Sequence, residues 1–305
     1  MTTPQLGRVV FWMTGTLLSF SAMALSVRAL AGKFSVFEIL SIRSGFGLLI
    51  LLAVGLPQPA LMRTFVPRRL QWHLLRNVTH FFGQYLWTLG LTLLPLATVF
   101  ALEFTMPAWV ALLATLFLGE RLNISRVGVL VCGLLGVLII LRPGVTAFQP
   151  ASLLVLGAAF SYATSNIGTK KLLAGGDSTF AILLWMSVIQ LPLAYLGSDP
   201  LFFTRMGWDN LLGIVGIGIA GLSAHYCLTK ALAAGDATVV IPLDFMRLPL
   251  IAFIGWTFYG EALDVLVFAG GAVIFAGVLW NLNFETRRTR SLQAAVKPAT
   301  RGTAE

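Results

Sequence analysis

Residues 97–120 read ATVFALEFTMPAWVALLATLFLGE, and a related pattern, TVVIPLDFMRLPLIAFIGWTFYGE, returns 141 residues later at 238–261. At this offset Glu103 aligns with Asp244, and both stretches end in Gly-Glu. Matched acids and matched Gly-Glu ends are not expected from apolar helices that resemble each other by chance. The chain is therefore a duplicated unit. Further matches at the same offset pair Tyr85 with Tyr226, Thr88 with Thr229, and Gly136-Val137-Leu138 with Gly277-Val278-Leu279.

Composition indicates that the solvent of this chain is mostly lipid. Hydrophobic residues make up 57% of the 305 residues and charged residues 11%, too few polar groups to cover a water-soluble fold. Apolar stretches of about 20 residues, the length that crosses a bilayer as a helix, recur along nearly the whole chain. Continuous apolar runs favour helices over a β-barrel. We predict an all-α integral membrane protein with ten transmembrane helices at 9–30, 37–54, 77–94, 97–118, 127–141, 151–173, 179–196, 211–232, 238–259 and 265–282.

Basic residues gather on one side when the loops are assigned alternately to the two sides of the membrane. Fifteen fall on one side, and four fall on the other: Arg28, Lys33, Arg142 and Arg205. Cytoplasmic loops are enriched in Lys and Arg, so both termini are predicted to be cytoplasmic and the protein to lie in the cell (inner) membrane. The fifteen residues are Arg8, Arg63, Arg68, Arg69, Arg76, Arg121, Arg126, Lys170, Lys171, Lys230, Arg287, Arg288, Arg290, Lys297 and Arg301.

The duplication and the span count together predict the domain organisation. Residues 1–142 and 143–284 each hold five predicted helices, and residues 285–305 form a basic cytoplasmic tail that is expected to be disordered. An odd number of spans per unit inverts the second copy relative to the first. Two inverted five-helix repeats are the architecture of many secondary transporters.

Several other classes of protein are disfavoured by the same sequence. The net charge of +9 would suggest a nucleic acid partner in a soluble protein, but here the basic cytoplasmic loops explain it. Both cysteines, Cys132 and Cys227, fall in apolar spans, so neither a disulfide framework nor a metal site is expected. The chain has no phosphate-binding loop for ATP and no His-Glu-x-x-His or Gly-x-Ser-x-Gly motif. We therefore expect no cofactor, no metal and no enzyme activity.

Two elements resemble the repeat signature of EamA-type carriers in the drug/metabolite transporter superfamily. They run from Ala97-Thr98 to Gly119-Glu120-Arg121-Leu122 and from Asp236-Ala237-Thr238 to Gly260-Glu261. Within that superfamily, Phe37-Glu38 with Arg43 and the run Trp87-Thr88-Leu89-Gly90-Leu91 look more like the S-adenosylmethionine uptake carriers. The resemblance implies ten helices, a cavity between two five-helix units and alternating access. Members of the superfamily carry amino acids, nucleotide sugars, cofactors, drugs and polyamines.

Charged residues inside the membrane are the first candidates for a substrate site, because an unpaired charge in lipid is costly. Four lie at mid-span: Glu103, Asp244, Arg247 and Arg43. An acid there can bind a cationic substrate or a coupling proton, and an arginine can hold a carboxylate. The alternative is a structural ion pair, for instance between Asp244 and Arg247, which stand three residues apart on one helical face. Pro107 and Pro249 are predicted to interrupt their helices just beyond the aligned acids.

Polar and aromatic residues at helical spacing extend this candidate site. Polar stripes in a membrane helix must face a cavity or another helix, so they either bind substrate or join helices together. The stripe residues that we assign to the site are His80 and Gln84, His225, and Tyr162 with Asn166. Aromatic side chains can stack on a ring or on a cation, although packing is an alternative role for them. These aromatic candidates are Trp87, Tyr85, Tyr226, Phe104 and Phe245.

The sequence therefore predicts a secondary active transporter of a small organic metabolite, namely an amino acid derivative or an S-adenosylmethionine-like compound. Its partners are the small-molecule substrate, the lipid bilayer, and a coupling proton or a counter-substrate. An exporter of drugs or amino acids on the same fold is the alternative, and the direction of transport remains open. A membrane-embedded enzyme and a channel are the alternatives of a different class.

Overall fold

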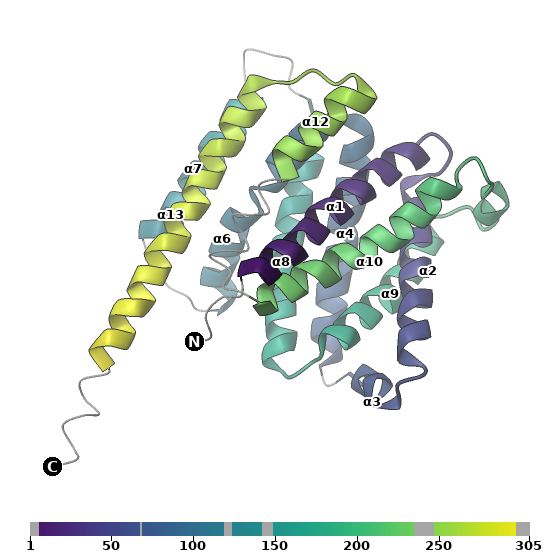
Figure 1. Cartoon of the computed structure of the whole chain (residues 1–305), viewed down its shortest axis with the longest axis horizontal. Coiled ribbons are helices and arrows are strands. Elements are labelled where there is room, and N and C mark those ends of the chain that lie inside the picture. Colours follow the sequence, from purple (N-terminus) through teal and green to yellow (C-terminus); the bar gives the residue numbers. More distant parts are fainter. Residues whose placement is uncertain (1–5, 68, 119–123, 142–148, 235–246, 297–305) are drawn as a thin grey trace.

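The computed structural model describes residues 6–67, 69–118, 124–141, 149–234 and 247–296 of the chain. Within these ranges all regular secondary structure is helical (Figure 1). Two short 3-10 helices, Arg63–Phe65 and Phe202–Arg205, lie in loops. The α-helices are α1 (Leu6–Leu30), α2 (Val36–Gly55), α3 (Pro59–Met62), α4 (Leu70–Leu93), α5 (Leu96–Glu103), α6 (Met106–Leu118), α7 (Ile124–Leu141), α8 (Ala151–Ala174), α9 (Thr179–Leu196), α10 (Leu211–Ala234), α12 (Arg247–Tyr259) and α13 (Val265–Val296).

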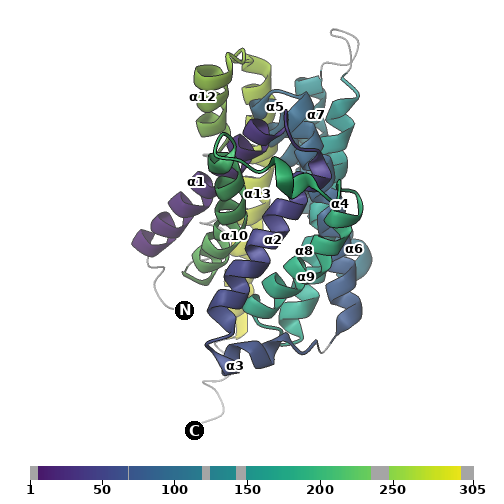
Figure 2. The same ribbon diagram turned by 90° about the vertical axis from the view of Figure 1, so that its right-hand side faces the viewer.

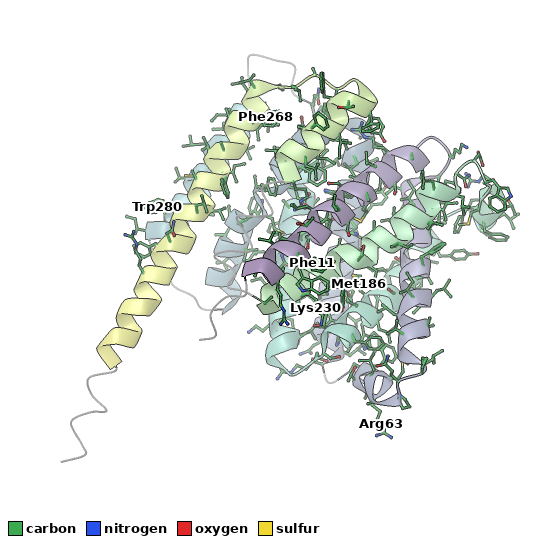
Figure 3. The ribbon with its side chains drawn as sticks, viewed as in Figure 1. Phe11, Arg63, Met186, Lys230, Phe268 and Trp280 are labelled. Carbon is green, nitrogen blue, oxygen red and sulfur yellow. The ribbon has the colours of Figure 1, made fainter. Side chains whose placement is uncertain are left out.

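Several of these helices are apolar enough to lie in lipid. Four of the described stretches, Gly7–Leu30, Val36–Gly55, Thr179–Leu196 and Leu211–Leu228, are also long enough to cross a membrane. Shorter apolar stretches lie in α5 and α6, α7, α12 and α13. Many large apolar side chains are exposed, and Figure 3 shows one of them, Trp280, on the outer edge of α13. An apolar outer surface of this kind is expected where lipid is the solvent. The chain is a multi-pass membrane protein.

The span predicted at 97–118 is broken in the middle. Helix α5 ends at Glu103 and α6 begins at Met106, with Phe104 and Thr105 in the turn between them. Pro107 explains the break, because its ring would clash with the carbonyl of Glu103, four residues earlier, in a continuous helix. The Thr105 hydroxyl donates to the Leu102 carbonyl at 2.7 Å and so satisfies one acceptor at the end of α5. The predicted interruption at Pro107 is confirmed, and it leaves Glu103 as the last residue of its helix.

Helix α13 differs from the sequence-based expectation at its carboxyl end. We predicted a span ending at 282 and a disordered tail from 285, but α13 continues to Val296. Its 32 residues correspond to about 48 Å at 1.5 Å per residue, which exceeds the roughly 30 Å of a hydrocarbon core. Figure 1 shows the end of α13 reaching beyond the other helices. Polar residues after 282 therefore extend the helix out of the apolar region instead of ending it.

The helices pack in pairs that join the two halves of the chain. α1 packs on α10, α4 on α8, α2 on α9, α5 on α12, and α7 on α13 (Figures 1 and 2). In every pair one helix comes from before residue 142 and the other from after residue 148. Glycine permits a close approach in the last of these pairs, since a Cβ on Gly136 of α7 would lie 2.6 Å from the carbonyl oxygen of Gly270 in α13. The interior is consequently built at the meeting of the two halves.

Candidate functional site

An acid from the first half of the chain meets a base from the second half inside this bundle. Oε1 of Glu103, at the end of α5, lies 3.9 Å from Nη1 of Arg247, at the start of α12. This separation is that of an ion pair, longer than a direct hydrogen bond. The indole N–H of Trp87 in α4 donates to Oε2 of the same carboxylate at 2.8 Å. Arg247 is buried, and the Glu103 side chain is 13% exposed. Three helices thus converge on one carboxylate.

Aromatic rings surround the guanidinium of Arg247. Its central carbon lies 4.6 Å from the ring centroid of Phe20, 5.2 Å from that of Phe100 and 5.6 Å from that of Phe104. Cation–π attraction holds an arginine at such distances, and the same ring faces can receive a planar ligand. Phe20 comes from α1 and Phe100 from α5, so the aromatic wall also combines separate helices.

A second buried arginine, Arg43, contacts α4 three residues before Trp87. Arg43 of α2 donates from Nη1 to the side-chain oxygen of Gln84, while its Nε has no hydrogen-bond partner among the described residues. A Cβ on Gly221 of α10 would lie 2.8 Å from that Nε, so the glycine makes room for the arginine. A cavity of about 10 Å³, enough for roughly one water molecule, adjoins Arg43. It is lined by Arg43, Ser44, Gly47, Met186, Ser187, Gln190, Gly221 and Leu222.

His80 connects these two parts of the interior. Its Nδ1 lies 2.9 Å from Nε2 of Gln190 in α9, and its ring centroid is 5.5 Å from those of His225 and Tyr162. The His225 ring in turn lies 5.7 Å from the ring of Phe20, which contacts Arg247. We call the connected set the central cluster: Phe20, Arg43, His80, Gln84, Trp87, Phe100, Glu103, Phe104, Tyr162, Gln190, His225 and Arg247.

The electrostatic balance of this interior is positive. Arg43 and Arg247 are buried, and so is Arg76 in α4. Arg76, which the loop count placed among the basic loop residues, donates to the Asn77 side-chain oxygen at 2.5 Å and to the Thr169 hydroxyl at 3.4 Å. Within the described part of the central cluster, two guanidinium groups, those of Arg43 and Arg247, stand against one carboxylate, that of Glu103. A neutral or anionic ligand fits such a balance better than a cation.

Most of the residues singled out by sequence come together in the central cluster. They are Arg43, His80, Gln84, Trp87, Glu103, Phe104, Tyr162, His225 and Arg247. Asp244 and Phe245 lie outside the described residues, so the predicted pairing of Asp244 with Arg247 stays a prediction. Among the described residues, Glu103 is an acid that the structure brings to Arg247.

Three predicted residues lie apart from the cluster. Tyr85 packs on Phe37 with ring centroids 4.8 Å apart, and Tyr226 is 45% exposed. Tyr85 and Tyr226 each follow a cluster residue, Gln84 or His225, by one position. One residue turns a helix by about 100°, so each tyrosine faces away from the cluster residue before it. Asn166 of α8 is exposed, and its Nδ2 lies 3.4 Å from the sulfur of Met106.

Sequence reasoning missed Phe20, Phe100 and Gln190. Gln190 had a usable signal, because it is a lone amide within an otherwise apolar stretch, and polar groups in membrane helices usually face the interior. Its side chain is buried and also donates to the Asn77 carbonyl at 3.2 Å. Phe20 and Phe100 had no such signal, since a phenylalanine in an apolar helix is as suited to lipid as to a site.

Comparison with known proteins matches this architecture to a transporter family. The model of the EamA-like transporter family matches residues 7–142 and again residues 149–283. A riboflavin transporter from Rhizobium johnstonii is 34% identical over 232 residues, which are 76% of this chain and 75% of that protein. An S-adenosylmethionine uptake transporter from Rickettsia felis is 27% identical over 280 residues, 90% of this chain and 92% of that protein. A solved structure covering 93% of this chain and 99% of its own has a TM-score of 0.62 at 18% identity, which shows a shared fold.

Proposed function

The chain belongs to the EamA-like transporter family, and from this premise we propose that it carries a metabolite with a planar heteroaromatic ring across the cell (inner) membrane by alternating access. The family confirms the expectation of a small-molecule transporter and of a protein that is not an enzyme. The substrate class, the mechanism and the membrane are our proposal. The riboflavin type of substrate is favoured.

One observation carries the proposal, namely the Glu103 and Arg247 pair at the junction of the two halves. Burying charges costs free energy that a purely structural contact could avoid with apolar residues. A pair held 3.9 Å apart, with Trp87 on the carboxylate, can exchange its partners for polar groups of a ligand. Because the partners come from different halves, a ligand between them would contact both halves at once. Alternating access requires such a site.

The walls and the charge of the site favour a flavin-like substrate. Phe20, Phe100 and Phe104 offer ring faces on which a flat heteroaromatic ring can stack. Gln84 and His80 provide amide and imidazole groups for hydroxyl and ring-nitrogen atoms. Two arginines against one carboxylate in the described part of the central cluster disfavour a cationic substrate. A relative at 34% identity is named a riboflavin transporter.

An S-adenosylmethionine-like amino acid derivative is the second candidate. It too carries a planar heteroaromatic ring, and its zwitterionic end could use both Glu103 and Arg247. The relative of that name aligns over 90% of this chain. Both candidates share the ring, and they differ in the net charge that the cluster must accept.

The arrangement of helix pairs supports ten spans in two inverted repeats. If α1 and α8 are equivalent, and likewise α4 and α10, the α1–α10 pair maps onto the α8–α4 pair, which also forms. The α2–α9 and α7–α13 pairs then map onto themselves. The charge asymmetry of the loops supports cytoplasmic termini. A 10 Å³ cavity beside Arg43 is far too small for either candidate, so we infer that binding requires the halves to separate.

Calorimetric titration of the purified protein in detergent tests the substrate class. We expect saturable binding of riboflavin that weakens at least about tenfold in Glu103→Gln, the cost of losing one charge-assisted contact. Binding of S-adenosylmethionine with no binding of riboflavin would make the S-adenosylmethionine-like compound the favoured substrate. Binding of neither compound by well-folded protein would contradict the proposal.

A further inference from the structure

Three ion pairs join the two halves of the chain at one end of the bundle. They are Arg28 with Glu261, Lys33 with Asp209, and Arg205 with Glu38. Each pair combines a residue before 142 with a residue after 148. The six residues lie at the end of α1 and in the loop after it, in the first turn of α2, in the loop between α9 and α10, and in the loop after α12, all of which the proposed topology places on the outer face. Three of the four basic residues that the sequence left on that face are therefore paired across the halves.

The first pair is built into two helix ends. Arg28 donates from Nη1 to Glu261 at 2.6 Å, and its Nε donates to the Leu91 carbonyl, one of the acceptors left over at the end of α4. Its Nη2 donates to the carbonyl of Leu94. Glu261 accepts the Leu96 backbone N–H, an unsatisfied donor at the start of α5, at 2.8 Å. Both side chains are largely buried, at 17% and 13% exposure, so solvent weakens this pair little.

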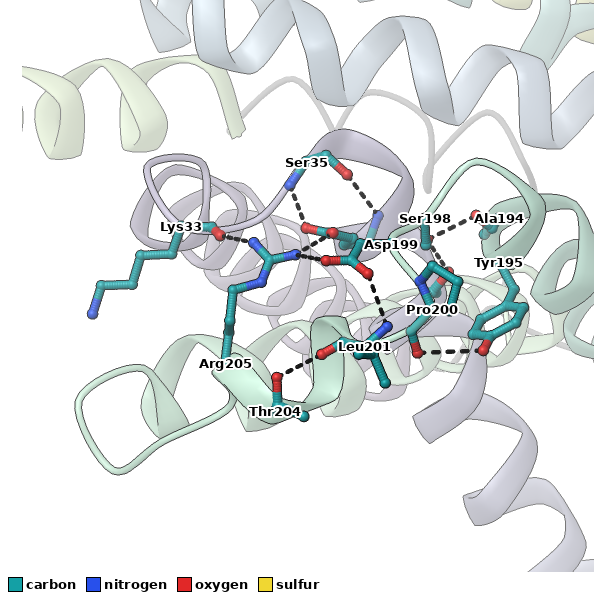
Figure 4. Close-up of polar contacts among 12 residues, drawn as sticks. Lys33, Ser35, Ala194, Tyr195, Ser198, Asp199, Pro200, Leu201, Thr204 and Arg205 are labelled. Atoms are coloured by element: carbon teal, nitrogen blue, oxygen red, sulfur yellow. Dashed lines mark hydrogen bonds and ion pairs between the residues drawn. The ribbon is translucent and has the colours of Figure 1, made fainter.

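The second strong contact surrounds Arg205, in the loop between α9 and α10. Its guanidinium donates to the Lys33 carbonyl at 2.7 Å and contacts the carboxylate of Glu38, both from the first half. It also reaches Oδ2 of Asp199 at 3.7 Å, within its own half (Figure 4). Glu38 is held in place because its other oxygen accepts the backbone N–H of Ser35 at 2.8 Å, which caps α2.

Helix α5 connects this end of the bundle to the central cluster. Its first residue, Leu96, is bonded to Glu261, and its last residue, Glu103, faces Arg247. Eight residues span only about 12 Å, so a shift of Glu103 on ligand binding is transmitted to Leu96 without an intervening loop. The same short helix therefore contacts the second half at both of its ends.

We propose that these three cross-half pairs form the outer gate of the carrier, closed in this structure, and that α5 couples the gate to the substrate site. The proposal rests on the alternating-access function proposed above. Opening the outer side requires all three pairs to break, since each ties one half to the other. Removing a pair lowers the cost of opening and shifts the population towards the outward-open state.

A reporter cysteine beneath the gate tests this without any substrate. Ser44→Cys, beside Arg43 and buried, is placed in a chain with Cys132→Ala and Cys227→Ala, and intact cells are treated with a membrane-impermeant maleimide. We expect labelling to accelerate about threefold or more in Glu261→Gln and in Glu38→Gln, the population shift of one lost ion pair. Gln at position 38 can still cap α2, so folding is preserved.

Asp199→Asn is the matched control, because it removes a carboxylate from Arg205 without cutting a contact between the halves. Its labelling rate should stay unchanged. A second variant, Lys33→Cys with Asp209→Cys, is joined by a short bis-methanethiosulfonate cross-linker, which should stop transport until a reductant removes the link. Unchanged labelling in both gate variants, equal acceleration in Asp199→Asn, or full transport by the cross-linked double-cysteine protein would each overturn the gate. If instead neither riboflavin nor S-adenosylmethionine binds while the gate variants label faster, the proposed substrate fails and the gate stands.

Discussion

Glu103 and Arg247 stand 144 positions apart in sequence and 3.9 Å apart in the structure, the carboxylate from the first half of the chain facing the guanidinium from the second. The indole N–H of Trp87 donates to the other oxygen of the carboxylate, Oε2, at 2.8 Å. The distance between the two charged groups therefore depends on how the two halves are placed relative to each other. The pair also offers a ligand one acceptor and one donor at the junction of the two halves.

Glu103→Gln should abolish most transport while leaving the fold intact. The amide is of similar size but loses the charge that faces Arg247, and a hydrogen bond to a charged group contributes about 1.5–3 kcal/mol. We expect the initial uptake rate to fall at least about tenfold at equal protein level. Uptake of labelled riboflavin into cells measures it, with Asp199→Asn as an acid-removal control. Wild-type uptake by Glu103→Gln would remove this residue from the site.

The double variant Glu103→Gln with Arg247→Gln separates a structural pair from a binding pair. A lone charge in the interior is the costly state, so melting temperature should drop in each single variant and recover partly in the double variant. Transport should stay lost in the double variant, because charge balance does not rebuild contacts to a ligand. The melting curves and uptake are measured on the same preparations. Transport restored to the wild-type rate would show that the pair only joins helices.

Gly221→Ala should disturb Arg43 through packing alone. The added Cβ would lie 2.8 Å from Nε and 3.1 Å from Cγ of Arg43, which must move and lose its bond to Gln84. We expect riboflavin affinity to fall several-fold, about 1 kcal/mol, with a small change in melting temperature. Gly32→Ala is the control, since nothing lies within 4 Å of its added Cβ. Unchanged affinity in Gly221→Ala would place Arg43 outside the site.

Reporter fusions test the topology on which the inverted repeat depends. Alkaline phosphatase joined after residue 284 should be inactive, and the same enzyme joined after Gly32 should be active, because the proposed topology places only the latter position in the periplasm. A green fluorescent protein fusion at the carboxyl end should be bright. Phosphatase activity after residue 284 contradicts cytoplasmic termini.

The stabilisation that the Lys33 and Asp209 pair gives to the fold should decrease as the pH falls. The hydrogen bond from Lys33 lowers the pKa of the Asp209 carboxyl below its ordinary value of about 3.9. A carboxyl group whose pKa is lowered in the folded state stabilises the fold at pH values above its ordinary pKa. This stabilisation is lost as the pH falls through the lowered pKa. Wild-type protein should therefore melt slightly above Asp209→Asn at pH 7, and the difference should vanish in acid. The effect is small because both side chains are exposed. A difference that grows on acidification would contradict the assignment.

The apolar spans and the helix break at Pro107 followed from sequence because both arise from local physical chemistry. Span length is set by bilayer thickness, and a proline removes a donor wherever it stands. Glu103 could be nominated because a charge in lipid is costly on its own. Its partner could not, since helical periodicity relates residues three or four positions apart, and Arg247 reaches Glu103 only through the packing of α12 on α5.

The choice of helix face was the weak step in predicting the site. Tyr85 and Tyr226 match each other in the repeat, yet each turns away from the central cluster, beside the cluster residues Gln84 and His225. Repeat matching finds positions that share an environment, and it does not say whether that environment is the interior. Gln190 lies on the interior face of an apolar helix. Its sequence signal was weak because it carries no charge and does not belong to a stripe of polar residues at helical spacing.

Counterflow in proteoliposomes tests the central claim most directly. Purified protein is reconstituted into vesicles loaded with unlabelled riboflavin, and entry of tritiated riboflavin from outside is followed over time. A carrier that alternates between two open states predicts a transient accumulation above equilibrium, absent from empty vesicles and strongly reduced in Glu103→Gln. Entry that is indifferent to internal riboflavin, or no entry of riboflavin or S-adenosylmethionine with correctly folded protein, would contradict the account.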